Sequence, residues 1–147
     1  MQLLLKLHRL SHKLHKRKVP ILPKMIYYLN YLLFNSSVPP EVVIGRNTIF
    51  AYGGIGVVIH KRAIIGDNCN IGQGITIGGR SKYFDVPKIR NNVYIGAGAR
   101  VLGPITVGNE TIIAPNSVVL KNIPDNCMVA GVPAMIKKEN IKVSDFV

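Results

Sequence analysis

The residues best suited to move a proton in this sequence are one histidine, one tyrosine and one aspartate. His60 is the single histidine beyond residue 15, and an imidazole with an ordinary pKa of about 6.5 can take a proton from a hydroxyl group. It follows an aliphatic residue in GGIGVVIH, so we expect an outward side chain that is either an exposed corner residue or a general base. Tyr52 either positions a substrate, replaces a missing base or packs its hydroxyl against residues 51–56. Asp85 either orients an imidazole, binds a substrate or is a solvated turn residue.

Three further histidines lie near the start of the chain. His8, His12 and His15 have spacings that place their side chains on one face of a helix. They could bind a metal, but no carboxylate or thiol accompanies them, so the pattern favours a solvated basic face and no metal. Two cysteines are too few for a disulfide framework and favour a reducing cytoplasm, with Cys69 as a small core residue.

The net charge of +12 over 147 residues implies an acidic partner. The first forty residues contain no Asp or Glu, and seven Lys and Arg residues fall between Lys6 and Lys24. Leucines recur there at helical spacing, at Leu3, Leu7, Leu10 and Leu14. We therefore predict a basic helical arm over residues 1–38, with no signal peptide or membrane span. The arm either contacts an anionic membrane through residues 1–18 or packs on the rest of the protein. Its aromatic residues do not alternate with basic ones, which argues against nucleic acid.

A period of six residues dominates the chain from about residue 40 to residue 123. The aliphatic positions of one frame are Ile59, Ile65, Ile71, Ile77, Ile89, Ile95, Val101, Val107, Ile113 and Val119. Small or β-branched residues recur four positions later, and glycine often follows the aliphatic residue, as expected for a corner. Repeats of this kind predict an all-β solenoid in which each coil buries its aliphatic side chains on the next.

The solenoid domain is expected over residues 39–138. Its frame is interrupted between Ile77 and Ile89 by a charged and aromatic segment, which predicts a loop over residues 79–88 that projects from the coils. Residues 139–147 are expected to form a polar, mobile tail.

The segments IIGDNCNIGQGITIGG, PKIRNNVYIGAGARVLGPITVG and NIPDNCMVAGVPAMI resemble the hexapeptide-repeat acyltransferases, among them the serine acetyltransferases and related O-acetyltransferases of surface-polysaccharide pathways. This resemblance implies a left-handed parallel β-helix, acetyl-CoA as the acyl donor, and a homotrimer with sites between subunits. The sequence departs from the serine acetyltransferases at two family histidines. The first histidine position falls on Tyr52 or on Gly53, depending on where one alignment gap is placed. The second histidine position is occupied by Val86. These departures favour a sugar or a related hydroxyl over serine.

The same resemblance suggests which residues contact acetyl-CoA. Backbone N–H groups at Gly78 or Gly79 could stabilise an oxyanion, because glycine allows close approach. The CoA phosphates could pair with basic side chains, of which the candidates are Lys88, Lys121 and Lys137. The pantetheine arm could lie along small residues that leave a groove between coils, namely Ala97, Ala99 and Ala114.

These observations predict an acetyl-CoA-dependent O-acetyltransferase acting on a hydroxyl of a small molecule or sugar, in the cytoplasm or at the inner face of the membrane. The alternative is a β-helix without a base, acting as a scaffold or subunit. A zinc-dependent carbonic anhydrase of the same fold is excluded, because it needs three histidines and the repeats contain only His60.

Overall fold

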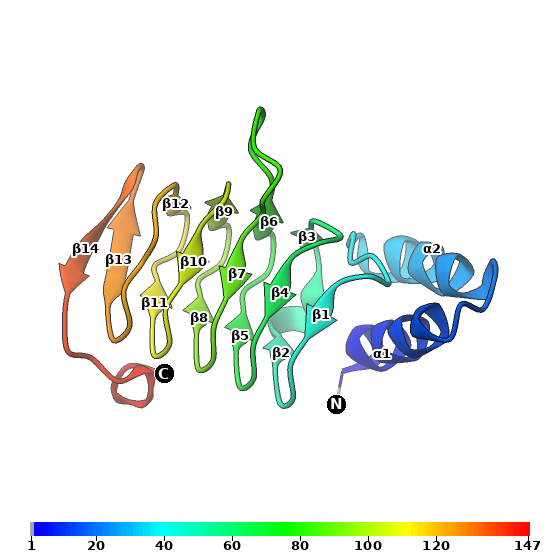
Figure 1. The fold of residues 1–147 in the computed structure, drawn as a ribbon. Helices are drawn as coiled ribbons and strands as arrows, with labels where there is room; N and C mark the ends of the chain where they lie inside the picture. Colours follow the sequence, from blue (N-terminus) through cyan, green and yellow to red (C-terminus); the bar gives the residue numbers. More distant parts are fainter. Residues whose placement is uncertain (1) are drawn as a thin grey trace.

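The structure, a computed structural model, describes residues 2–147. Two helices, α1 (Leu3–Lys16) and α2 (Leu22–Phe34), lie at one end of a row of short strands (Figure 1). The strands are β1 (Val43–Ile44), β2 (Ile49–Phe50), β3 (Val58–Ile59), β4 (Ile64–Ile65), β5 (Asn70–Ile71), β6 (Thr76–Gly78), β7 (Lys88–Ile89), β8 (Tyr94–Ile95), β9 (Arg100–Leu102), β10 (Thr106–Val107), β11 (Ile112–Ile113), β12 (Val118–Val119), β13 (Met128–Gly131) and β14 (Ala134–Lys138). Short 3₁₀ segments, η1 (Ala51–Gly54) and η2 (Val143–Asp145), complete the fold.

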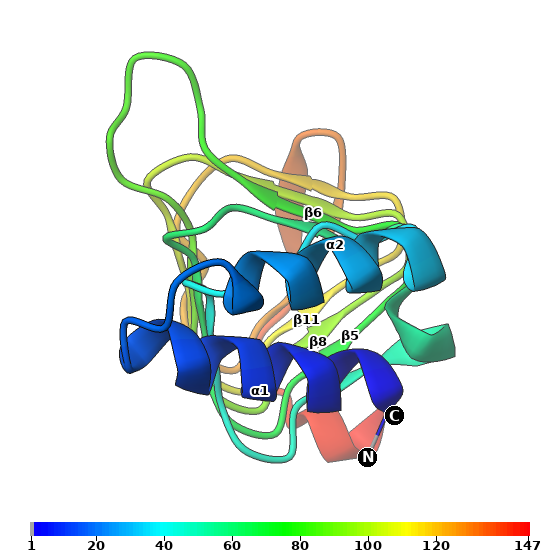
Figure 2. The ribbon, with the colours of Figure 1, turned by 90° about the vertical axis from the view of Figure 1, so that its right-hand side faces the viewer.

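The strands form the three sheets of a solenoid, which we name after their first strands. The β1 sheet contains β1, β4, β7 and β10; the β2 sheet contains β2, β5, β8, β11, β13 and β14; and the β3 sheet contains β3, β6, β9 and β12. Pairing is parallel except for the final β13–β14 hairpin, and Ile65 aligns with Ile44 on one side and with Ile89 on the other. Seen from the helical end, the coils are left-handed (Figure 2). The predicted β-helix is therefore confirmed.

The core is the stacked column of repeat side chains. All ten aliphatic positions of the six-residue frame are at most 2% exposed. The small positions four residues later are buried too, from Thr48 to Ser117. Burying an Ile or Val side chain contributes about 1.5–3 kcal/mol, so this column supplies most of the driving force for folding.

Glycines at the corners serve a purpose other than the conformational freedom expected of them. Gly66 does not have a positive φ, but a methyl group placed on it would lie 2.4 Å from Asn91 Oδ1. The coils approach so closely there that no side chain fits. The left-handed conformation falls instead two residues later, on asparagines such as Asn68, with φ of 56°.

Side chains also link successive coils at the corner between the β1 and β2 sheets. Asp67 Oδ1 accepts the Arg46 N–H at 2.7 Å, and Asn91 Oδ1 accepts the Asp67 N–H at 2.9 Å. Asn109 Oδ1 continues the ladder by accepting the Asn91 N–H at 3.1 Å. These bonds satisfy corner donors that the strand ladders leave unpaired.

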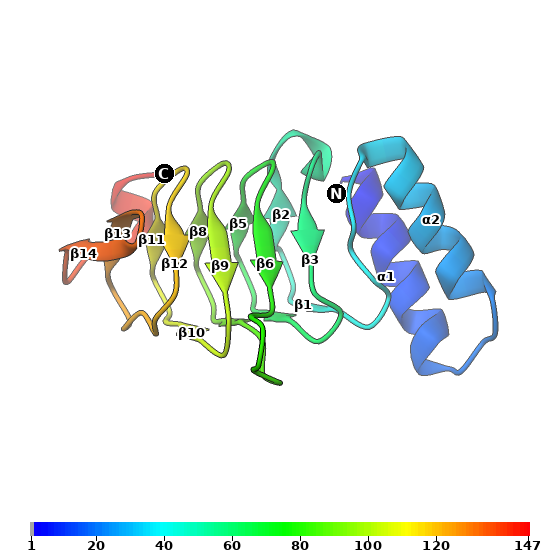
Figure 3. The same cartoon turned by 90° about the horizontal axis from the view of Figure 1, so that it is seen from above.

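The interruption of the repeat forms a loop that projects beyond the coils, whereas the rungs on both sides stay stacked (Figure 3). Residues 79–85 are exposed, but Val86 and Pro87 are already buried and Lys88 begins β7. The projecting part is therefore shorter than the segment 79–88 expected from the sequence.

The C-terminal residues are docked rather than loose, which differs from the mobile tail expected over residues 139–147. Ile141 is buried and exchanges hydrogen bonds with Asn126. The Val143 N–H donates to the Glu110 carboxylate at 3.0 Å. Burial of the apolar Ile141 side chain favours this docked position.

The arm caps the first coil through a different face of α1 from the one that the leucine spacing predicts. Leu4, Leu5, His8 and Ser11 are buried, whereas Leu3 and Leu10 are about half exposed. Neither helix of residues 2–147 is long and apolar enough to cross a bilayer.

Candidate functional site

His60 lies at the corner between the β3 and β1 sheets, which we call the His60 corner; it comprises residues 60–63, 78–87, 102–105 and 120–122. Its backbone N–H donates to the Ile77 carbonyl at 2.8 Å, which fixes it beside the start of the projecting loop. The imidazole is half-buried. Burial lowers the pKa of His60 below its ordinary 6.5, and the charges of Arg62 and Lys61 lower it further. The ring is therefore neutral at pH 7, as a general base must be.

The hydrogen bonding of the ring defines its tautomer. His60 Nδ1 accepts the backbone N–H of Arg62 at 3.2 Å. Since a backbone N–H can only donate, the neutral ring carries its proton on Nε2. In this orientation His60 offers a substrate an N–H donor. It accepts a proton at a free nitrogen only after giving up the Arg62 contact, at a cost of about 1 kcal/mol.

The loop packs over the same corner. A methyl group on Gly79 would lie 3.9 Å from His60 Cδ2 and 3.7 Å from Val86 Cγ1, so all three residues are neighbours. Within residues 2–147 no carbonyl accepts the Gly79 N–H, which leaves that donor available to a ligand. The guanidinium of Arg62 lies 4.0 Å from the centre of the Phe84 ring and donates to the Phe84 carbonyl. The structure thus brings the imidazole, a free backbone donor and an anchored loop together.

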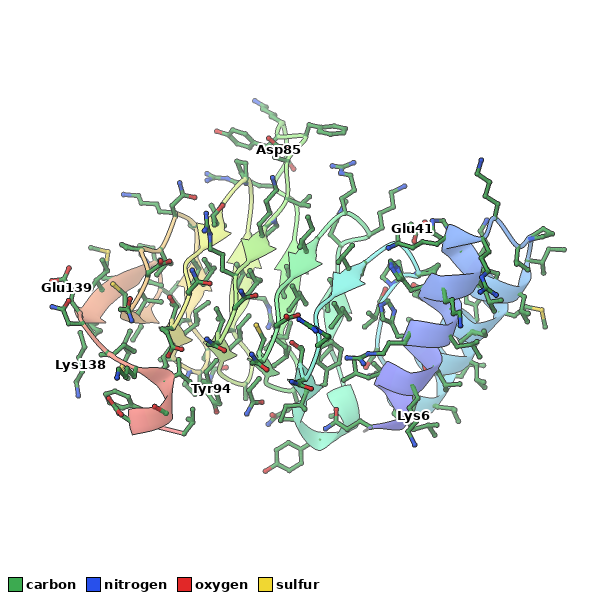
Figure 4. The ribbon with its side chains drawn as sticks, turned by 60° about the horizontal axis from the view of Figure 1, so that its bottom comes forward. Lys6, Glu41, Asp85, Tyr94, Lys138 and Glu139 are labelled. Carbon is green, nitrogen blue, oxygen red and sulfur yellow. The ribbon has the colours of Figure 1, made fainter. Side chains whose placement is uncertain are left out.

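The other two predicted proton-transfer residues are placed differently from each other. Asp85 is exposed in the projecting loop, next to Val86 of the His60 corner and far from the helical arm on which Lys6 is labelled (Figure 4). Tyr52 is 82% exposed in η1, with φ of 50°, so its hydroxyl does not pack against the insertion. It precedes β3 whereas His60 follows it, so the two residues lie at opposite ends of that strand.

The predicted CoA contacts divide between two corners of the chain. Gly78, Lys88 and Lys121 lie at or beside the His60 corner. Ala97, Ala99 and Ala114 lie instead at the corner between the β2 and β3 sheets, which we call the Tyr52 corner; it comprises residues 51–57, 72–75, 96–99 and 114–117. Lys137 is exposed on β14, at the end of the coil opposite the helices. One copy of the chain therefore does not gather the whole predicted set.

The Tyr52 corner has an open outer surface but no groove between its coils. A methyl group on Gly72 would lie 2.6 Å from the backbone nitrogen of Ala97, so adjacent coils are in contact. Ala97 and Ala114 are half-exposed, and a methyl group on Gly74 would meet no atom within 4 Å. Ala99 is fully buried, and both its N–H and its carbonyl are hydrogen bonded within the protein. The expected groove between coils is therefore absent at this corner, where Ala97 and Ala114 are accessible from outside and Ala99 is part of the core.

Two of the three histidines of the arm, His8 and His12, contact backbone carbonyls of the protein. His8 is 2% exposed, and its Nε2 lies 3.2 Å from the Val42 carbonyl. His12 Nδ1 lies 2.7 Å from the Pro40 carbonyl, and only His15 of the three is exposed. The solvated face expected for these residues is therefore wrong for His8. Burial, with the nearby His12 and Arg9 charges, lowers the pKa of His8 to about 4. Throughout residues 2–147, no three His, Cys, Asp or Glu side chains are grouped as metal ligands.

Sequence reasoning missed Arg62. The available signals were a cation two residues after His60 and the pair Tyr83–Phe84 in the loop. Which cation meets which ring depends on how the coils stack, because Arg62 and Phe84 are 22 residues apart.

Comparisons with known proteins agree with this architecture. Residues 87–121 match the family model described as bacterial transferase hexapeptide (six repeats). The chain is 40% identical over 131 residues to a serine acetyltransferase of Synechococcus elongatus, an alignment that covers 88% of this chain and 53% of that protein. It is 38% identical over 137 residues to a serine acetyltransferase of Bacillus subtilis, with 92% and 63% covered. The chain thus spans between 53% and 63% of the length of these relatives.

Solved structures show the same similarity. The serine acetyltransferase of Brucella abortus in complex with coenzyme A matches with a TM-score of 0.89 at 37% identity, covering 94% of this chain and 56% of that one. The serine acetyltransferase of Neisseria gonorrhoeae in complex with serine matches with a TM-score of 0.86 at 31% identity, covering 92% and 55%. By sequence over most of its length and by fold, this chain is a hexapeptide-repeat protein similar to the serine acetyltransferases.

Proposed function

We propose that the chain is an acetyl-CoA-dependent O-acetyltransferase that acts on a hydroxyl of a small molecule. The observation that carries this proposal is that Gly79, whose N–H donates to no carbonyl within residues 2–147, is a neighbour of His60, on a solenoid that matches a coenzyme A complex with a TM-score of 0.89. An imidazole and a fixed backbone donor are the two groups that acyl transfer to an alcohol requires.

In the proposed reaction the acceptor hydroxyl attacks the thioester carbonyl of acetyl-CoA while His60 takes the hydroxyl proton. The carbonyl oxygen becomes an oxyanion, which the Gly79 N–H stabilises. Collapse of this intermediate breaks the C–S bond and forms the ester, and the proton on His60 passes to the departing CoA thiolate. In this role the His60 ring turns so that a bare nitrogen, rather than Nε2–H, faces the acceptor.

Serine is the first acceptor to test, because the similar proteins are named serine acetyltransferases. A sugar hydroxyl is the second, since Tyr52 and Val86 stand where the resemblance places family histidines. The use of acetyl-CoA favours the cytoplasm.

A complete site in this proposal needs more than one copy. The His60 corner and the Tyr52 corner lie on either side of the β3 sheet, so the Ala97 surface of one copy can face His60 only on another copy. Val43 (42% exposed) and Ile64 (41% exposed) are neighbouring outward side chains on the β1 sheet, whereas Ile49 (47%) and Val58 (46%) are exposed on the β2 and β3 sheets. Exposed apolar side chains that lie side by side, as Val43 and Ile64 do, are a feature of protein interfaces. We therefore infer a homotrimer, and sedimentation that shows only a monomer would remove the shared site.

The decisive experiment measures thiol release from acetyl-CoA with serine and with a panel of sugars, together with the mass of the product. The proposal expects acceptor-dependent release of CoA and one acetyl ester per CoA. Absence of release with every acceptor, from a folded oligomer, would support the scaffold alternative instead.

A further inference from the structure

The helical arm is fixed to the solenoid through α1. His8, Arg9 and His12 meet backbone carbonyls of Val42, Gly45 and Pro40, and Gln2 accepts the Phe50 N–H at 2.9 Å. Leu4 and Leu5 are at most 1% exposed beneath these contacts. The buried face of α1 is therefore committed to the protein, and any outside partner must meet another face of the arm.

That other face is formed mainly by α2. Pro23, Ile26 and Asn30 are the buried residues of this helix. The opposite side is apolar and exposed: Leu22 (43%), Met25 (60%), Tyr28 (61%), Leu29 (44%), Leu32 (80%) and Leu33 (56%). A helix that is apolar on all sides is normally covered by protein or lipid. At 13 residues α2 is too short to span a bilayer, so it can only lie along one.

The outer stripe of α1 continues this surface. Leu3, Lys6, Leu10 and Lys13 follow one another at helical spacing, and all four are exposed. Figure 4 shows Lys6 at the helical end of the molecule. Leucines that alternate with lysines beside an apolar helix are the composition of interfacial helices.

The charged side chains of the arm all have one sign. The exposed cations of the arm are Lys6, Lys13, Lys16, Arg17, Lys18 and Lys24, and residues 2–40 contain no Asp or Glu. Two copies that met face to face through α2 would bring these cations together, which opposes a symmetric protein interface. An anionic bilayer satisfies both the apolar side chains and the cations.

A cavity adjoins the same end of the protein. It has a volume of about 700 Å³ and lies between the α1–α2 turn and the start of the solenoid. Ile21, Met25 and Tyr28 line it, and its wall carries the cations Lys24 and Lys61 together with one carboxylate, Glu41. Cavities of 300–1,000 Å³ accommodate small ligands, so part of a lipid fits here.

We propose that α2, the outer stripe of α1 and this cavity form a docking face for an anionic membrane surface. This face keeps the outer stripe of α1, which lies within the residues 1–18 expected from the sequence, and adds α2 and the cavity to it. Lys61 follows His60 in the chain, so docking brings the His60 corner toward the membrane surface.

The test is co-sedimentation of the full chain with vesicles of phosphatidylcholine alone or with phosphatidylserine added. Wild type is expected to bind the phosphatidylserine vesicles and to be released by salt. Leu32→Glu should weaken binding at least tenfold, since it places a carboxylate in the interface. Lys6→Gln with Lys13→Gln should weaken it about 30-fold, at about 1 kcal/mol for each lysine. Val132→Glu is the matched control, because Val132 is 72% exposed at the opposite end of the solenoid.

Several results would overturn the proposal. One is that the wild type does not bind phosphatidylserine vesicles, and another is that Leu32→Glu and Val132→Glu lose vesicle binding equally. A third is that Leu32→Glu changes the oligomeric state in the absence of lipid, which would make α2 a protein interface. Thermal unfolding of each variant identifies a folding defect, and Leu29→Gln then repeats the test with a milder change.

Discussion

The guanidinium carbon of Arg62 lies 4.0 Å from the centre of the Phe84 ring, and the guanidinium also donates a hydrogen bond to the Phe84 carbonyl. One side chain thus ties the projecting loop to the coil that carries His60. The planar guanidinium can stack on a ring and donate at its edge at the same time, which an ammonium group cannot do equally well.

Arg62→Ala should release the loop while leaving the solenoid intact. A cation–π contact and a hydrogen bond together contribute about 1–2 kcal/mol, so trypsin cleavage at Lys82 should accelerate about tenfold. Acetyl transfer should fall through a higher KM for the acceptor. Arg62→Lys should recover only part of both effects. Arg80→Ala is the control, since Arg80 lies 5.9 Å from the Tyr83 ring within the loop itself. Equal cleavage rates in wild type and Arg62→Ala would show that the contact does not hold the loop.

His60→Ala should lower the turnover number about a hundredfold to ten-thousandfold, the usual effect of losing a positioned base. Acetyl-CoA affinity should change little, because none of the residues predicted to contact acetyl-CoA is removed by this substitution. The pKa of His60 is lowered from 6.5, so wild-type activity should decline only below that pH as the imidazole becomes protonated. The mutant should lose this acid limb. If His60→Ala keeps both the wild-type turnover number and the decline of activity at acid pH, His60 is not the base, and Tyr52 and Asp85 become the residues to test.

The solenoid could be predicted because its determinants are local and repeated. Ile71 and Ile95, for example, occupy equivalent positions in successive coils, so the position of one buried residue predicts the position of the next. The reason for the corner glycines could not be predicted in the same way, because it lies in the distance between coils. Gly66 is required by the position of Asn91, 25 residues away.

In the arm and in the candidate site, too, contacts between segments distant in the sequence could not be predicted. The leucine spacing correctly predicts a helix, but it does not reveal that α1 packs on both α2 and the solenoid through different faces. His8 is buried because the Val42 carbonyl offers its ring a partner, and nothing in the local sequence encodes that carbonyl. Likewise, the single histidine of the repeats directs attention to His60, whereas its contact with Arg62 and the free donor at Gly79 depend on the folded corner.

His8 should make the protein less stable as the solution becomes mildly acidic. Its Nδ1 has no hydrogen-bond partner within residues 2–147, so protonation would place a charge in a buried site beside His12 and Arg9. Folding lowers its pKa from 6.5 to about 4, so the unfolded chain binds the extra proton first as the pH falls. The full stability is therefore present above pH 6.5, is lost at about 1.4 kcal/mol per pH unit toward pH 4, and changes no further below that.

Urea unfolding between pH 7 and pH 4.5 measures this effect. His8→Gln keeps an N–H that can donate to Val42 but does not titrate, so its unfolding free energy should vary less with pH. His15→Gln is the control, since His15 is exposed on the same helix. Parallel pH dependences in wild type and His8→Gln would assign the acid sensitivity to other groups.

Ile65→Asp and Ile64→Asp form the sharpest test of the coil register, because two adjacent isoleucines of β4 face opposite sides. Ile65 is 1% exposed between Ile44 and Ile89, whereas Ile64 is 41% exposed on the outer surface. A carboxylate at residue 65 would lie in an apolar column without a partner, at a cost above about 4 kcal/mol, which is a large part of the stability of an ordinary domain. Ile65→Asp should therefore abolish the β-sheet circular dichroism signal. Ile64→Asp should retain that signal but, if the outer aliphatic side chains form the inferred trimer contact, should sediment as a smaller species. A folded Ile65→Asp protein would mean that the register is wrong, and a trimeric Ile64→Asp protein would exclude this surface from the contact.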